Sequence, residues 1–135
     1  MKLNQTIAYA VAAMTYMAAQ PAGSLISNTT TSRATKTPER YLLQVLRKLV
    51  LSGVLNSVRG VQGGFRLAKP ANKITLLEIV EAVDGPIGQC ERVDLPAMSA
   101  KASAGMLNAF RAVEGDARKR LASVTLADLL RAKAA

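Results

Sequence analysis

The stretch Val58-Arg59-Gly60-Val61-Gln62-Gly63-Gly64-Phe65-Arg66-Leu67-Ala68-Lys69-Pro70 decides the fold. Two short runs of alternating apolar and polar residues flank a glycine-rich loop that carries one arginine, Arg59. This pattern predicts a β-hairpin with strands at about residues 54–58 and 64–68. The tip of such a hairpin is small, flexible and positively charged.

A helix is predicted directly before the hairpin. Thr37 fits the capping position, Pro38 fits the first helical position, and Gly53 fits the end. One face is apolar at helical spacing and is expected to be buried (Tyr41, Leu42, Val45, Leu46, Leu49 and Val50). The other face carries side chains that can reach phosphates and base edges in a major groove (Arg40, Gln44, Arg47 and Lys48, with Tyr41 at the edge). Alone, such a face would indicate a solvated helix; the adjacent basic hairpin favours a winged helix, a module that usually binds DNA.

Basic residues are concentrated in the same part of the chain. Residues 1–73 contain ten Lys and Arg against a single acidic residue, Glu39, whereas residues 74–135 contain eight basic and eight acidic residues. The net charge of +9 therefore belongs to the half with the predicted helix and hairpin. A one-sided positive field is expected when the partner is a polyanion. The alternative is a generally basic, soluble surface.

The chain has one cysteine, Cys90, and no histidine. One thiol cannot form an internal disulfide, so a reducing, cytoplasmic compartment is expected. Without histidine the chain cannot build a Cys–His zinc site or a His-dependent catalytic triad. The glycine-rich loop at residues 60–64 is not followed by the Lys-Ser/Thr pair of a phosphate-binding loop. These absences predict that the protein is not an enzyme.

Helices are also predicted on both sides of this module. An apolar run at residues 7–19 resembles a secretory signal peptide, but its helical spacing favours a packed helix at about residues 4–20, too short to span a membrane. A short helix is expected within residues 25–35, held mainly by Leu25 and Ile26. Thr75-Leu76-Leu77-Glu78 is a capping box that opens a helix at about residues 75–84.

A long helical pattern, from about Ser99 to Ser123, follows a Gly- and Pro-containing loop at residues 85–98. Its apolar stripe is more than one small winged-helix domain can cover (Met106, Phe110, Val113, Ala117 and Leu121). We therefore assign the stripe to a homodimer interface, with packing inside the chain as the alternative. The expected organisation is a DNA-binding winged helix-turn-helix domain at residues 1–84, an effector-type loop at 85–98, and a dimerisation helix with a short C-terminal helix at 99–135.

Several motifs resemble those of the Rrf-two-type bacterial regulators, the family of the iron–sulfur cluster regulator, the nitric-oxide-sensing repressor and the cysteine-metabolism repressor. The resemblance covers nearly the whole chain. Its most specific parts are the hairpin, with Ser57-Val58-Arg59-Gly60 and Gly63-Gly64-Phe65-Arg66-Leu67-Ala68, and the following Ile74-Thr75-Leu76-Leu77-Glu78-Ile79-Val80. It implies a mostly helical winged-helix dimer that binds a partly palindromic operator in double-stranded DNA, usually as a repressor.

The resemblance also implies roles for particular residues. The recognition helix would use residues 38–48, with Arg40, Tyr41 and Gln44 nearest the bases or backbone. Arg59 at the wing tip would enter the minor groove, where narrowed A·T-rich DNA has a deep negative potential. The glycines of the wing would let its backbone approach the phosphates (Gly60, Gly63 and Gly64).

The sequence departs from the family in the loop before the long helix. Sensing members typically carry three cysteines there, which hold an iron–sulfur cluster, whereas this loop has only Cys90. A cluster normally needs four ligands, most of them thiolates, so no cofactor is expected. Cys90 could be a thiol switch or inert. A small ligand or a partner protein could act as effector near the loop, or the regulator could lack a sensor.

Three hypotheses for function therefore stand side by side. The first is a sequence-specific DNA-binding regulator. The second is a winged-helix module that binds a protein partner, for which the charge of the wing half is a poor fit. The third is a redox protein or thiol-based sensor centred on Cys90, which lacks a histidine partner.

Overall fold

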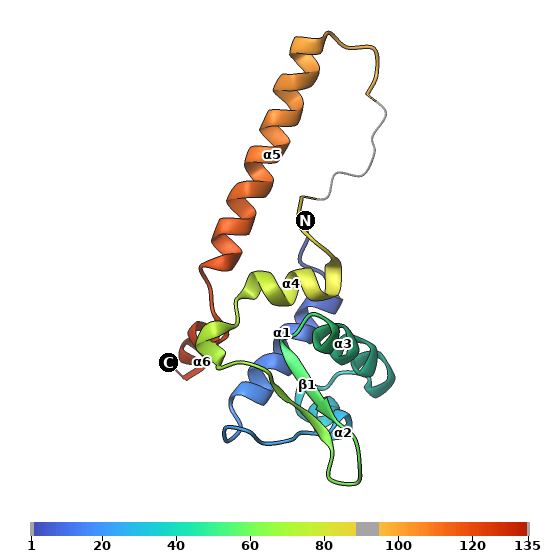
Figure 1. Cartoon of the computed structure of the whole chain (residues 1–135), viewed down its shortest axis with the longest axis vertical. Coiled ribbons are helices and arrows are strands. Elements are labelled where there is room, and N and C mark those ends of the chain that lie inside the picture. Colours follow the sequence, from blue (N-terminus) through green and yellow to red (C-terminus); the bar gives the residue numbers. More distant parts are fainter. Residues whose placement is uncertain (1, 89–94, 135) are drawn as a thin grey trace.

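The computed structural model describes residues 2–88 and 95–134 and is mostly helical, with one two-stranded antiparallel hairpin (Figure 1). In chain order the elements are α1 (Gln5–Ala18), α2 (Asn28–Thr35), α3 (Glu39–Leu51), β1 (Leu55–Val58), β2 (Gly64–Leu67), the 3-10 turn η1 (Ala71–Lys73), α4 (Leu76–Asp84), α5 (Ala100–Ala122) and α6 (Leu126–Ala134). The predicted fold class, a mostly helical chain with a small hairpin and a long C-terminal helix, is confirmed.

The core is built from aliphatic side chains. Leu42, Leu46 and Leu49 of α3 are fully buried against Ala10, Ala13 and Met14 of α1 and against residues of β1 and α4. Alanines on α1 let the two helices lie close together, which is how a chain with few aromatic residues fills its interior. The apolar stripe predicted for α3 therefore points inward, and its polar face is left at the surface.

The second helix, Asn28–Thr35, lies within the predicted range 25–35, but Leu25 and Ile26 are outside it. Residues 25–27 are extended, and Ile26 forms an antiparallel bridge with Phe65 of β2. The two backbone hydrogen bonds of this bridge join Ile26 N to Phe65 O at 2.9 Å and Phe65 N to Ile26 O at 2.8 Å. Ile26 thus ties the hairpin to the segment before α2 and does not hold the helix from within.

Hydroxyl and amide groups stabilise the Thr-rich helix α2. Ser27 caps it by accepting from the Thr30 backbone N–H, and the buried Thr31 hydroxyl donates to the Ser27 carbonyl at 2.9 Å. The Asn28 side chain donates to the Glu39 carbonyl at 2.9 Å, which links α2 to the first residue of α3. Side-chain hydrogen bonds replace the apolar contacts that the sequence pattern led us to expect.

The C-terminal helix is fastened to the base of α4. Thr75 and Glu78 form the predicted capping box of α4, with the Glu78 N–H donating to the Thr75 hydroxyl at 3.1 Å. Thr75 also pairs with Thr125, and the Leu126 N–H donates to the Ile74 carbonyl at 2.8 Å. These contacts bury Leu126 completely.

Replacing Leu126 with Ala should lower the free energy of unfolding by about 2–5 kcal/mol, because a fully buried leucine is exchanged for a cavity. Urea unfolding followed by circular dichroism measures the change. Leu51→Ala is the matched control: its side chain is 87% exposed, and the free energy of unfolding should change by less than about 0.5 kcal/mol. Equal losses in the two variants would contradict the anchoring role of Leu126.

Helix α5 extends away from the rest of the chain, at the opposite end of the long axis from the hairpin (Figure 1). None of its residues is buried. Its C-terminal half is joined to α4 by an ion pair between Arg118 and Glu81, whose Nη1 and Oε2 atoms are 2.5 Å apart. Across residues 2–88 and 95–134, no helix has both the length and the apolar character to cross a bilayer.

Candidate nucleic-acid interface

The outer face of α3 presents the polar side chains that the sequence assigned to it. Arg40, Gln44, Arg47 and Lys48 are exposed, and Leu43 beside them is half-buried. The strongly amphipathic helix is fixed by its buried leucines, so these four side chains face solvent together. This surface is a continuous row of hydrogen-bond donors on one helix.

A groove of about 640 Å³ separates α3 from the hairpin. Arg47 lines its helix side, and Arg59 with Gly60 lines its hairpin side. Gly63 and Gly64 form part of the same wall. The structure therefore brings the predicted hairpin residues and one of the predicted helix residues around one hollow.

Three other predicted residues lie on the side of α3 that faces away from the hairpin. Tyr41, Gln44 and Lys48 line a small hollow of about 110 Å³ together with residues of α1 and the end of α4. The Tyr41 hydroxyl forms a hydrogen bond with the Thr6 hydroxyl. Its ring meets that of Tyr9 edge to face, with centroids 5.4 Å apart. Tyr41 thereby helps to orient α3 on α1.

Thr37 does not cap the third helix, so that prediction is wrong. Pro38 occupies the capping position, without a side-chain hydrogen bond, and the helix begins at Glu39. The Thr37 side chain is buried and its hydroxyl lies 2.8 Å from that of Thr35. Thr37 holds the turn between α2 and α3 from inside, and its side chain is not available at the surface, whereas Pro38 is exposed.

The positions of two glycines where the loop joins β2, Gly63 and Gly64, have a structural explanation. A Cβ at Gly63 would lie 2.1 Å from the Val58 carbonyl oxygen, and one at Gly64 would lie 2.7 Å from that of Ile26. Gly64 also has φ +156°. At Gly60, where φ is +119°, the space is open. Gly63 and Gly64 permit the hairpin and its bridge to Ile26, and Gly60 leaves the outer surface of the tip free of a side chain.

We expect Gly64→Ala to lower both the free energy of unfolding, by about 1–3 kcal/mol, and the affinity for DNA, since the added methyl group would collide with backbone atoms of Ile26. Chemical unfolding and fluorescence anisotropy measure the two quantities. Gly115→Ala is the control, because nothing lies within 4 Å of its added Cβ and alanine favours a helix. Unchanged stability and DNA affinity in Gly64→Ala would refute this account.

The groove also contains residues that the sequence did not single out. Asn28 and Ser57 line it, and the Oδ1 atom of Asn28 is buried with no hydrogen-bond donor among the described residues. Val61, at the tip, is fully exposed. The alternation of apolar and polar residues along the hairpin could have indicated that Ser57 faces the groove. Asn28 is brought beside α3 by a tertiary contact, which no pattern in the neighbouring sequence predicts.

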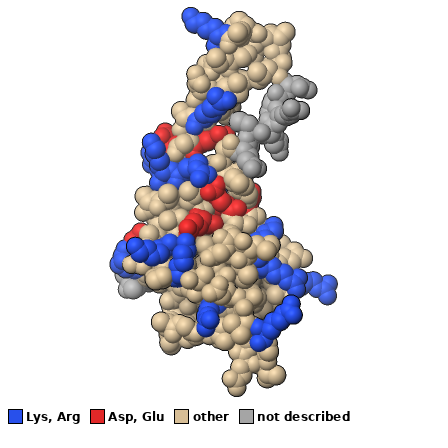
Figure 2. Space-filling view, viewed as in Figure 1, with Lys and Arg blue, Asp and Glu red and all other residues tan. Residues whose placement is uncertain are grey.

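Charge is distributed unevenly over the surface. Figure 2 shows acidic side chains gathered around α4 and the base of α5, whereas the part of the molecule below them carries only Lys and Arg in this view. The acids Glu78 and Glu81 pair with Lys69 and Arg118. The end that carries α3 and the hairpin is therefore positively charged, as the sequence count indicated.

A family model described as "Rrf2: Iron-dependent Transcriptional regulator" matches residues 3–132. The chain belongs to the Rrf2 family. Members of this family are DNA-binding transcriptional regulators and not enzymes. The family to which the hairpin and α4 motifs pointed is thus confirmed.

Relatives from several bacteria match over nearly the whole length. Protein aau3 of Rhizobium meliloti is 30% identical over 139 residues, covering 98% of this chain and 87% of that protein. The structure of CymR, the global cysteine regulator of Bacillus subtilis, is 25% identical, with a TM-score of 0.74 and 97% of each chain covered. The structure of T. potens IscR is 26% identical, with a TM-score of 0.71, covering 98% of this chain and 88% of that one.

This Rrf2 chain has fewer thiolates than an iron–sulfur cluster usually takes as ligands. It has one cysteine and no histidine, and among residues 2–88 and 95–134 no three of His, Cys, Asp and Glu gather closely enough to hold a metal ion. Clusters are held mostly by thiolates. Cys90, the candidate redox residue, lies outside the described residues.

We therefore expect the protein purified without oxygen to be colourless and to contain no stoichiometric iron. Visible absorption spectroscopy and iron analysis check this. Operator binding should also be unchanged by an iron chelator or by Cys90→Ser. A coloured preparation whose iron is needed for DNA binding would show that ligands other than cysteine hold a cluster.

Proposed function

We propose that the protein is a homodimeric, sequence-specific repressor that binds a partly palindromic operator without an iron–sulfur cluster. In this function α3 enters the major groove, and the hairpin reaches the neighbouring minor groove. Arg40, Gln44, Arg47 and Lys48 contact bases or phosphates, with Tyr41 and Pro38 at the margin. Arg59 enters the minor groove, and Gly60 lets the tip approach the sugar–phosphate backbone.

One observation supports this function above all others: Arg47 of α3 and Arg59 of the hairpin line a common groove between these two elements. A helix and a hairpin separated by such a groove can enter the major and the minor groove that lie on either side of one phosphate backbone. The positive charge makes the affinity strongly dependent on salt.

The dimer is needed for specificity. One α3 helix reads only a few base pairs, whereas a two-fold dimer presents two such helices to two half-sites about one helical turn or more apart. The stripe on α5 supplies the contact surface, because Phe110 and Val113 are 64% and 67% exposed in the single chain. A dimer bound over a promoter represses by excluding the polymerase.

In this function an effector acts on the loop that precedes α5, residues 85–98. Ile87, in the first part of this loop, is tied to both neighbouring helices: its N–H donates to Glu81 at 2.8 Å, and Arg118 donates to its carbonyl at 3.3 Å. A small ligand or a protein effector at residues 85–98 would therefore act on α4 and α5 together.

Selection of genomic DNA fragments by the purified protein tests the function. At low salt a small set of fragments with a shared inverted repeat should be enriched, and the enrichment should fall steeply as salt is raised. A promoter fusion in cells then gives higher expression when the protein is removed. No enriched sequence at low salt would refute sequence-specific binding, and lower expression would refute repression.

A further inference from the structure

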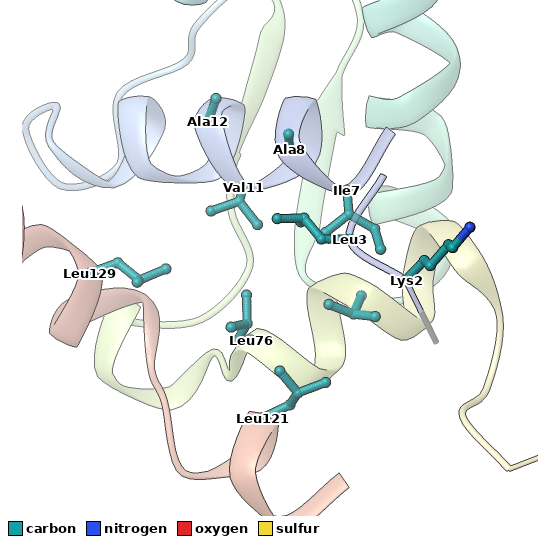
Figure 3. A pocket seen from close by; sticks show the side chains of 10 residues that line it. Lys2, Leu3, Ile7, Ala8, Val11, Ala12, Leu76, Leu121 and Leu129 are labelled. Carbon is teal, nitrogen blue, oxygen red and sulfur yellow. The ribbon is translucent and has the colours of Figure 1, made fainter. Parts of the chain in front are cut away.

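The pocket at the base of α5 lies apart from the surface that the proposed function uses. It has a volume of about 470 Å³ and is formed where α1, α4, α5 and α6 meet. Figure 3 shows Leu3, Val11, Leu76 and Leu121 directed toward a common space, with Lys2 at the edge. Lys2 is the only residue of the lining whose side chain forms hydrogen bonds, so the pocket has no set of groups with which to read a base.

Glu39, by contrast, is an acidic residue within the DNA-binding half of the chain. It is the only acid among residues 1–73, against ten Lys and Arg. It is the first residue of α3, and it is exposed. None of the ion pairs formed within residues 2–88 and 95–134 involves Glu39. A carboxylate therefore stands at the start of the helix that the proposed function places in the major groove.

Two side chains of α2 hold Glu39 in place. The Thr29 hydroxyl donates to Oε1 of Glu39 at 2.5 Å, and the Asn28 amide donates to the Glu39 carbonyl oxygen at 2.9 Å. Both the carboxylate and the backbone of Glu39 are thus positioned before DNA binds. A carboxylate has about four acceptor sites, and the Thr29 hydroxyl uses one of them. The others are available to a donor on a ligand.

The position of Glu39 on α3 directs it toward DNA. Glu39, Leu43 and Arg47 follow one another at intervals of four residues, so they are neighbours on one side of the helix. Leu43 and Arg47 line the groove between α3 and the hairpin, as does Asn28, the hydrogen-bond partner of Glu39. Recognition helices contact base edges mainly with their N-terminal residues. Glu39 is therefore placed to meet a base edge when α3 lies in the major groove.

The chemistry of a carboxylate selects among the four bases. It only accepts hydrogen bonds, and it repels other acceptors. In the major groove cytosine presents the N4 amino group, whereas adenine presents an acceptor, N7, beside its N6 amino group. Guanine presents two acceptors, and thymine presents a carbonyl and a methyl group. Cytosine is therefore the base that suits a carboxylate best. Phosphates repel the carboxylate as well, so it weakens binding to DNA that lacks the matching base.

We propose that Glu39 is a specificity-determining residue, whose carboxylate accepts a hydrogen bond from the N4 amino group of one cytosine in each half-site. This inference rests on the proposed function and deepens it. The basic side chains of α3 add affinity for DNA in general, whereas Glu39 disfavours half-sites without that cytosine. Thr29 is then a positioning residue, because its hydroxyl orients the carboxylate.

A library of operator variants, with every base at each position, tests the role of Glu39. The full-length parent should prefer cytosine about tenfold or more at one position of each half-site in anisotropy titrations. Glu39→Gln keeps an acceptor for Thr29 but removes the charge. In this variant the preference should fall below about twofold or move to adenine, whose N6 and N7 atoms pair with glutamine. Its affinity for unrelated DNA at low salt should rise.

Asp116→Asn is the matched control, because it makes the same change of charge at an exposed residue of α5. It should leave the preference for cytosine intact. Thr29→Val keeps the charge of Glu39 and removes its donor, so the preference should be weaker than in the parent. Thermal melting followed by circular dichroism confirms that each variant is folded.

An unchanged base preference in folded Glu39→Gln would overturn the inference, and Glu39 would then serve only to join α2 to α3. An unchanged preference in Thr29→Val would overturn the positioning role of Thr29. Failure of the parent to select any operator would instead refute the proposed function. The failure of the inference and the failure of the proposed function are therefore distinguishable.

Discussion

Phe110→Asp should convert the protein to a monomer and reduce its affinity for a two-half-site operator about 100-fold or more. Phe110 is 64% exposed in the single chain and belongs to the apolar stripe on α5. An aspartate there would bury an unpaired carboxylate in the dimer. Without the dimer, the second half-site no longer binds at high effective concentration. Sedimentation equilibrium and fluorescence anisotropy measure the two effects.

Ala112→Asp is the matched control for this variant. Ala112 is exposed and lies about 200° around the helix from Phe110, so the same charge enters on the opposite face. It should leave both the dimer and the operator affinity close to those of the parent. If Phe110→Asp remained a dimer, the stripe would not be the dimer interface. The alternative, that the stripe packs inside its own chain, would then be supported.

Arg59→Ala should weaken operator binding roughly 100-fold. A charge-assisted hydrogen bond contributes at least about 1.5 kcal/mol, and a dimer loses two copies, hence about 3 kcal/mol. The dependence of affinity on salt should also become shallower, because fewer counterions are released. Anisotropy titrations with the selected operator at several salt concentrations provide both quantities.

Arg120→Ala controls for the loss of charge alone. Arg120 is exposed in the last turn of α5, outside both α3 and the hairpin. Removing this side chain should change the affinity for the operator only through the loss of one positive charge from the protein, without the loss of a direct contact. Equal effects of the two substitutions would mean that the wing makes no specific contact with DNA.

Local patterns in the sequence predicted most of the elements. The hairpin, the capping box of α4 and the amphipathic face of α3 depend on residues within a few positions of one another, and each is found where it was expected. The position of the polar face of α3 followed from its buried leucines.

Long-range contacts account for what the sequence did not predict. Thr37 had the chemistry of a helix cap, but it is buried and bonded to Thr35, so the tertiary position of α2 overrides the local preference. Ile26 pairs with Phe65 across almost forty residues, so it lies in an extended segment before α2 and not inside the helix. The pocket at the base of α5 combines four helices, and no single stretch of sequence reports it.

The bridge between Ile26 and Phe65 has a thermodynamic consequence. It adds a third backbone segment beside β2, one residue pair from the start of the loop, so in the proposed complex the strands of the wing are already ordered before DNA binds. The conformational entropy that a free hairpin would lose on binding is already spent during folding. Only the tip around Gly60 keeps freedom to adjust to the width of a minor groove. If the wing binds DNA as proposed, its strands are therefore preorganised, and adaptation to different operators falls to the few residues of the loop.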